Sequence, residues 1–200
     1  QKKHLSRWGV GILLTGFLLG TFLPSFVLAA PRQAPTLEVL INEVAWGGTL
    51  DYSGDEWIEL YNPSTSDIDM TGWTLIAESG SPNITLSGVI PAKGFFLLER
   101  TNDDTVSDIT ADQIYPFTGN SLNNSGDKLQ LLNGTTLIDT ANSGGESWPA
   151  GSGSPDYASM ERIGVVADSS TAWASNDGIT VNGYDGNTPT PNPIRGTPKQ

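Results

Sequence analysis

Cysteine is absent from this chain of 200 residues, and its single histidine, His4, lies close to the amino-terminal end. Residues 30–200 therefore contain neither a thiol nor an imidazole. This excludes a Ser-His-Asp triad, a Cys-His dyad, a histidine-based zinc site and a thiolate cluster. Any catalysis would depend on carboxylates, Lys, Tyr, Ser or Thr. We predict no catalytic residues, and a protein that binds or supports another molecule.

Basic residues are also few, and acidic residues outnumber them. Three of the 10 Lys and Arg precede residue 30, whereas all 22 Asp and Glu follow it, so residues 30–200 carry a net charge of −15. Such a surface repels phosphate backbones and anionic lipids. We therefore predict that nucleic acid is not a partner, and that the chain meets a membrane only through its amino-terminal segment, if that segment is not cleaved.

That segment has the features of an export signal. Residues 8–28 carry no charge, follow a basic stretch and end in small residues. We predict that residues 1–29 are a signal peptide cut after Ala29, or alternatively an uncleaved membrane-anchoring helix over residues 8–28. Gly20 and Pro24 disfavour a continuous helix. In either case we expect an exported protein, either secreted or held at the cell surface.

Long hydrophobic runs are missing after residue 31. Short apolar runs alternate with turn residues, and the chain has 23 Gly and 13 Pro. This pattern predicts a single all-β domain, a sandwich of two sheets, after a linker over residues 30–36. The expected strands are residues 37–46, 56–61, 73–78, 84–86, 95–99, 128–132 and 137–140. Asn133-Gly134 between the last two predicts a hairpin with a two-residue turn of type I′.

Alternation predicts which side chains enter the core. In residues 56–61, Ile58 and Leu60 share one face of the strand, whereas Trp57, Glu59 and Tyr61 share the other. We expect the aliphatic pair to be buried.

The first expected strand is less clear. Its alternation puts Val39, Ile41 and Glu43 on one face, and both faces of residues 37–44 look partly covered. Residues 95–98 are apolar on both faces, which is typical of a central strand between a core and a covering loop.

Several runs of the sequence resemble the lamin tail domain, especially its bacterial exported members. They are residues 41–46 (INEVAW), 55–62 (DEWIELYN), 69–75 (DMTGWTL), 90–100 (IPAKGFFLLER), 122–127 (LNNSGD), Asp139, 148–149 (WP) and 159–162 (SMER). Together they place the domain over residues 37–173. The resemblance implies an immunoglobulin-like β-sandwich and no catalytic residues.

Two features leave room for a ligand. Asp51, Asp55 and Glu56 in one loop could hold Ca²⁺, which takes six to eight oxygen ligands, although their spacing matches no EF-hand. Solvated charge is the alternative interpretation, and we predict no other cofactor. Four tryptophans could form a platform for a carbohydrate, or could instead be core residues. They are Trp46, Trp57, Trp73 and Trp148.

Residues 174–200 differ in composition from the expected domain. They are rich in Pro, Gly, Asn and Thr, and residues 188–193 are typical of an extended, stiff linker. We predict an exported, non-catalytic module for protein interaction or cell-envelope association, with an envelope or extracellular protein or glycan as its partner. The alternative is a carbohydrate-binding or calcium-dependent adhesion module.

Overall fold

A computed structural model describes residues 35–186 and 190–200, and these residues contain no helix. The part of the chain that it describes therefore has no helix long and apolar enough to cross a membrane. The expected leader or anchor over residues 1–29 lies outside the described residues. The described residues are all-β, as the short apolar runs predicted.

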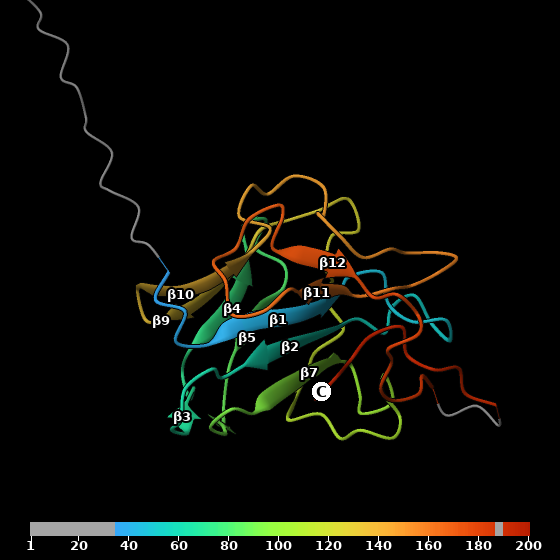
Figure 1. Cartoon of the computed structure of the whole chain (residues 1–200), viewed down its shortest axis with the longest axis horizontal. Coiled ribbons are helices and arrows are strands. Elements are labelled where there is room, and N and C mark those ends of the chain that lie inside the picture. The colour runs from blue at the N-terminus through green and yellow to red at the C-terminus, as the bar shows by residue number, and fades with distance from the viewer. Residues whose placement is uncertain (1–34, 187–189) are drawn as a thin grey trace, which may run out of the picture. The chain divides into compact units, whose positions relative to one another are not determined.

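The larger sheet has six strands. Their order is β12 (Trp173–Ser175), β11 (Met160–Arg162), β1 (Leu40–Ala45), β2 (Trp57–Tyr61), β7 (Phe95–Arg100) and β8 (Gln113–Tyr115). Neighbouring strands are antiparallel, apart from the parallel pair β7 and β8. Strands β1, β2 and β7 lie inside this sheet, so their backbone groups are paired on both sides (Figure 1).

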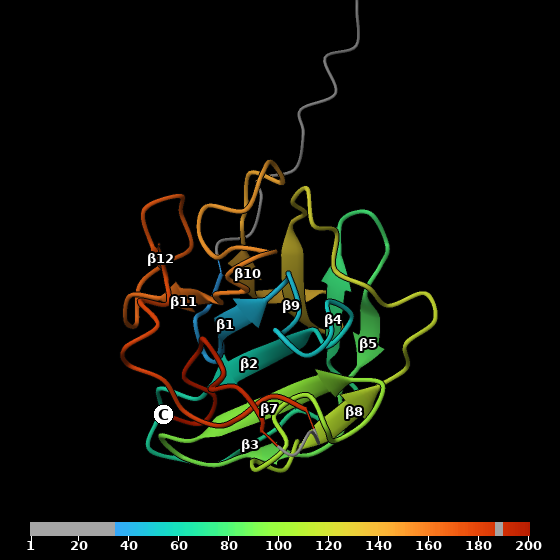
Figure 2. The same cartoon turned by 90° about the vertical axis from the view of Figure 1, so that its right-hand side faces the viewer.

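A second sheet of four strands packs on the first. Its order is β10 (Thr136–Ala141), β9 (Leu129–Asn133), β4 (Thr74–Ala77) and β5 (Asn83–Thr85), and β3 (Ile68–Asp69) pairs with β6 (Val89–Ile90) beside it. Figure 2 shows β4, β5 and β9 running in a different direction from β2 and β7. The layers form the immunoglobulin-like sandwich that the sequence predicted.

The core lies between the two sheets. Ile58 and Leu60 of β2 are fully buried there, as alternation predicted, and they belong to one cluster with Leu75 of β4 and with Leu129 and Leu131 of β9. Burying one such side chain contributes about 1.5–3 kcal/mol to the free energy of unfolding. The sandwich is therefore held mainly by these facing aliphatic rows.

A β-bulge at Asn42 sets the direction of the side chains in β1. Ile41 pairs with Leu60 and Glu43 pairs with Glu59, so Asn42 is an extra residue between them. Because side chains alternate along a strand, this insertion turns Glu43 away from the core. The prediction that Glu43 shares a face with Ile41 was wrong, since the bulge cannot be read from alternation.

The outer face of the six-stranded sheet is covered by the end of the chain. Ile194 is buried against Trp57 and Leu97, and Ser159 donates its backbone N–H to the carbonyl of Arg195 at 2.9 Å. The described residues thus include a tail that packs on the sheet at residues 194–195. The linker-like stretch predicted over residues 188–193 lies partly outside the described residues and stays a prediction. The red segment in Figure 1 ends beside β7. Composition alone did not reveal Ile194 as an apolar anchor.

The hairpin between β9 and β10 lies where the sequence placed it, but its turn is shifted by one residue. Asn133 pairs with Thr136, so Gly134 and Thr135 form the loop, and Gly134 alone of these residues has a positive φ, 58°. A single positive φ at the first loop position is typical of a type II′ turn. The Asn-Gly pair therefore did not become the expected type I′ turn.

Candidate functional site

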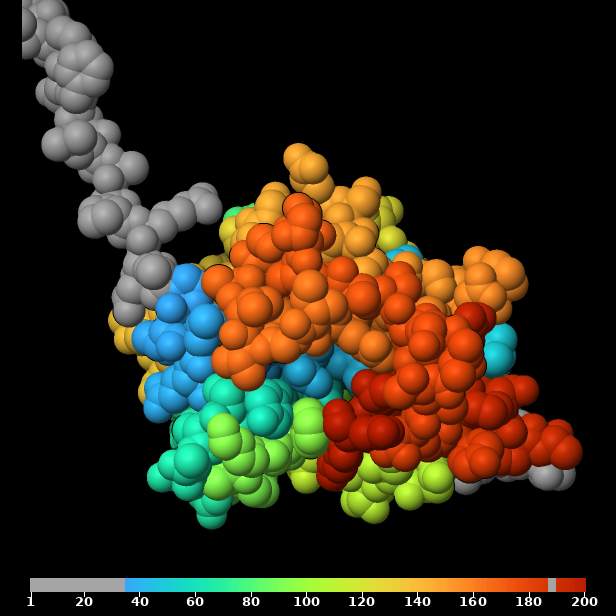
Figure 3. Space-filling model, viewed as in Figure 1, coloured from blue at the N-terminus to red at the C-terminus, as the bar shows by residue number. Residues whose placement is uncertain are grey.

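A groove of about 440 Å³ opens on the outer face of the six-stranded sheet. Its residues come from three parts of the chain: the middle strands, the loop after β11, and the last residues. The lining includes Asn42, Tyr61, Lys93, Phe95, Glu161, Arg162, Gly164, Val165, Thr197 and Gln200. In Figure 3 the dark red end of the chain borders green segments on this face. The volume lies within the range that small ligands occupy.

An aromatic pair lies in this groove. Tyr61 of β2 and Phe95 of β7 are cross-strand partners, and their ring centroids are 4.9 Å apart with planes tilted by 36°. Both rings are half-buried. The pair thus offers apolar ring surface within a largely polar groove.

Buried carboxylates hold the covering segment to the sheet. Glu43 accepts the Thr197 N–H at 2.9 Å and the Thr197 hydroxyl at 3.1 Å, and Glu59 accepts the Lys199 N–H and the Asn42 side-chain amide. We call residues 194–199 the C-terminal strap. Both carboxylates are fully buried beneath it. Hydrogen bonding by backbone N–H groups is one way in which such groups are satisfied away from water.

Burial dominates the titration of these groups. It raises the pKa of Glu59 to about 8, although the Lys199 N–H acts in the opposite direction. Burial also raises the pKa of Glu43, and the nearby Glu59 carboxylate adds to that rise. A pKa of about 8 favours the protonated form of Glu59 at neutral pH.

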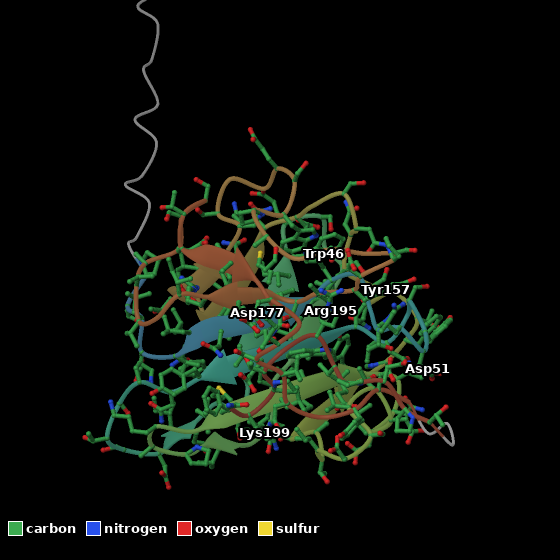
Figure 4. All side chains as sticks on the ribbon, turned by 45° about the vertical axis from the view of Figure 1, so that its right-hand side comes forward. Trp46, Asp51, Tyr157, Asp177, Arg195 and Lys199 are labelled. Atoms are coloured by element: carbon green, nitrogen blue, oxygen red, sulfur yellow. The ribbon has the colours of Figure 1, made fainter. Side chains whose placement is uncertain are left out.

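The predicted calcium ligands do not all come together. The backbone N–H of Asp51 donates to Asp185 at 2.9 Å, and the pKa of Asp55 is raised to about 6 by burial and by Asp51, Asp104 and Asp185. Figure 4 shows Asp51 apart from Lys199. In the part of the chain that the structure describes, no three Asp, Glu, His or Cys side chains are arranged to hold a metal ion. The calcium site stays a prediction.

Glu56 has a structural partner instead. Its carboxylate lies 3.2 Å from the Arg100 guanidinium and accepts the Leu122 N–H at 2.8 Å. Burial raises the pKa of Glu56 to about 7, while Leu122 and Arg100 act to lower it. This side chain fixes the loop before β9 against β7, and it does not accompany Asp51 and Asp55.

The four tryptophans do not form an exposed platform. Trp57 and Trp73 are buried, with 1% and 5% of their surfaces exposed. Trp46 and Trp148 stack on each other with centroids 6.4 Å apart, and each indole N–H donates to a backbone carbonyl. They act as core and loop anchors, which was one of the two interpretations of the sequence.

Comparison with protein-family models matches residues 32–145 to the Lamin Tail Domain. The chain belongs to the lamin tail domain family. A search of curated proteins found no match. The family suggests an immunoglobulin-like module for protein interaction, and its members are non-catalytic modules.

The groove in this lamin tail domain extends beyond the matched residues. Tyr61 and Phe95 lie inside the match, whereas Glu161, Val165 and Thr197 lie after it. Sequence analysis placed Tyr61 on the outer face but did not identify the groove. Its aromatic pair depends on the register between β2 and β7, and no local pattern in the sequence signals that register.

Proposed function

We propose that this lamin tail domain is an exported, non-catalytic binding module that associates with a component of the cell envelope or the extracellular space. The outer-face groove is the binding surface. Its volume of about 440 Å³ and its half-buried aromatic pair are the observations that support this role. The family supports the class of function, an immunoglobulin-like interaction module.

Sequence composition supports a non-catalytic role and export from the cytoplasm. Residues 30–200 lack His and Cys, and the uncharged segment over residues 8–28 is typical of an export signal. The net charge of −15 after residue 29 disfavours nucleic acid as the partner.

Photocrosslinking tests the binding role. A benzophenone amino acid at Val165, on the rim of the groove, should give an adduct with an envelope or extracellular component in the cells that make the protein. The same probe at Tyr52, which is 52% exposed in the loop that contains Asp51, is the matched control. Equal adducts from both positions, or none from Val165, would contradict the assignment of the groove.

Export is tested separately by sequencing the amino terminus of the protein recovered outside the cytoplasm. A chain that starts at Ala30 shows cleavage of the leader. An intact leader in the membrane fraction shows an anchor. Recovery of the whole protein in the cytoplasm would refute export.

A further inference from the structure

The two cationic side chains around the outer-face groove, Arg162 and Lys93, already have hydrogen-bond partners. Arg162 donates to the carbonyls of Ile41, Val166 and Thr140, and it forms a buried ion pair with Asp139. Lys93 donates its ammonium to the carbonyl of Pro63. Arg162 is neutralised by Asp139, and the Glu161 carboxylate in the same lining balances the exposed Lys93, so the groove has no excess positive charge for a phosphate, sulfate or uronate group.

Three other polar groups in the groove are available. Within residues 35–186 and 190–200, no hydrogen bond uses the Asn42 Oδ1, the Tyr61 hydroxyl or the second carboxylate oxygen, Oε2, of Glu161. The first and last accept hydrogen bonds, and the hydroxyl both donates and accepts. Three such groups around one groove fit a ligand that carries several hydroxyls.

The aromatic pair supplies the apolar part of the same site. Tyr61 and Phe95 present half-buried rings with centroids 4.9 Å apart. The C–H face of a pyranose ring can pack on such rings and release water from both surfaces. An aromatic surface beside a few convergent polar groups is the common composition of a small-ligand site.

A peptide is a poorer fit to this surface. One recurring way in which an extended peptide binds is to add a strand to an exposed sheet edge. The strands under the groove, β1, β2 and β7, are internal to the six-stranded sheet, so their backbone groups are already paired. A ligand in the groove would therefore meet side chains and could not form the backbone hydrogen bonds of an added strand. This suits a sugar better than an extended peptide.

We propose that the outer-face groove binds a neutral oligosaccharide, with Tyr61 and Phe95 packing on a sugar ring and Asn42 and Glu161 accepting hydrogen bonds from its hydroxyls. The proposal rests on the proposed binding function and adds the chemical class of the ligand. It moves carbohydrate recognition from the tryptophans, which are buried or stacked on each other, to a different aromatic pair.

Isothermal titration of the purified full chain tests the proposal. The probes are cellotetraose, chitotetraose, maltotetraose and mannotetraose, with anionic tetragalacturonate as the charge comparison. At least one neutral tetrasaccharide should bind at millimolar concentration or below, whereas tetragalacturonate should not bind. Failure of all four neutral sugars, or preferential binding of tetragalacturonate, would overturn the proposal.

Variants identify the site. Tyr61→Ala and Phe95→Ala should each weaken binding at least tenfold, or about 1.4 kcal/mol. Tyr61→Phe keeps the ring and should weaken binding less than Tyr61→Ala, which guards against a folding defect. Tyr52→Ala, at an exposed tyrosine outside the groove, should leave the affinity unchanged. Equal loss in all variants, or no loss at Tyr61 and Phe95, would place the sugar elsewhere.

The outcomes also separate this proposal from the binding function on which it rests. Specific crosslinking from Val165 to a protein, with no sugar binding, would refute the ligand class and retain the binding module. Sugar binding that Tyr61→Ala abolishes would support both.

Discussion

At the scale of single residues, Arg162 joins the two sheets through one side chain. It is fully buried, pairs with Asp139 of β10, donates to the carbonyl of Ile41 in β1, and lies 4.4 Å from the centroid of the Trp173 ring. Burial raises the pKa of Asp139 to about 7, although Arg162 opposes that rise. The main contribution of such an ion pair to stability is that neither partner is left as an uncompensated buried charge.

Removal of this guanidinium should therefore cost far more than loss of an exposed partner. Arg162→Ala leaves Asp139 buried and unpaired, and should lower the free energy of unfolding by about 3–5 kcal/mol. Asp156→Ala removes an exposed carboxylate from Arg195 and should cost less than about 1 kcal/mol. Urea unfolding at pH 7 measures both values. Similar losses in the two variants would contradict the structural role of Arg162.

At the scale of elements, the C-terminal strap is in close contact with the six-stranded sheet at Gly196. A Cβ atom on Gly196 would lie 2.6 Å from the Glu43 Oε1 and 2.7 Å from the Trp57 Cζ2. Both neighbours are buried, so neither has room to move away. Glycine at this position lets the strap lie directly on the sheet.

Gly196→Ala should therefore lift the strap from the sheet. We expect faster hydrogen exchange in residues 194–200 and a loss of about 1–3 kcal/mol in the free energy of unfolding, since overpacking a tight contact forces a shift. Gly144→Ala is the matched control, because a Cβ there would meet no atom within 4 Å. Unchanged exchange in residues 194–200 of the Gly196 variant would show that the strap is not held at this contact.

At the scale of the whole molecule, buried carboxylates set the response to pH. Burial is the main cause that raises the pKa of Glu59 and of Glu99 to about 8, and of Glu56 and Asp139 to about 7. Each folded-state value exceeds that of the unfolded chain, so the folded state binds these protons more tightly. Their contribution to stability is fully present below about pH 4 and is lost as the pH rises toward 8.

The free energy of unfolding should accordingly be higher at pH 5 than at pH 8. Glu59→Gln should reduce that difference by at least about 1 kcal/mol, because it removes one raised titration. Glu38→Gln, at an exposed carboxylate, should leave the difference unchanged. Chemical unfolding at the two pH values gives the comparison, and greater stability at pH 8 would contradict the sign.

The sequence by itself determined the fold class and most of the strands. The seven predicted strands all appear, with ends shifted by a few residues, because their apolar runs and turn residues are local signals. It did not indicate β3, β6 or β8, and for β11 and β12 it offered only the family resemblance, through the motif at residues 159–162 and the domain end at residue 173. These strands have two or three residues, too few to show alternation, and long-range pairing defines them.

The candidate site was decided by the tertiary structure. The bulge at Asn42 turns Glu43 outward, the register of β2 and β7 pairs Tyr61 with Phe95, and the C-terminal strap returns from the far end of the sequence to cover the sheet. Each depends on contacts between residues distant in sequence. Local composition determines which segments are strands and turns, whereas only the packed sheets determine which side chains share one surface.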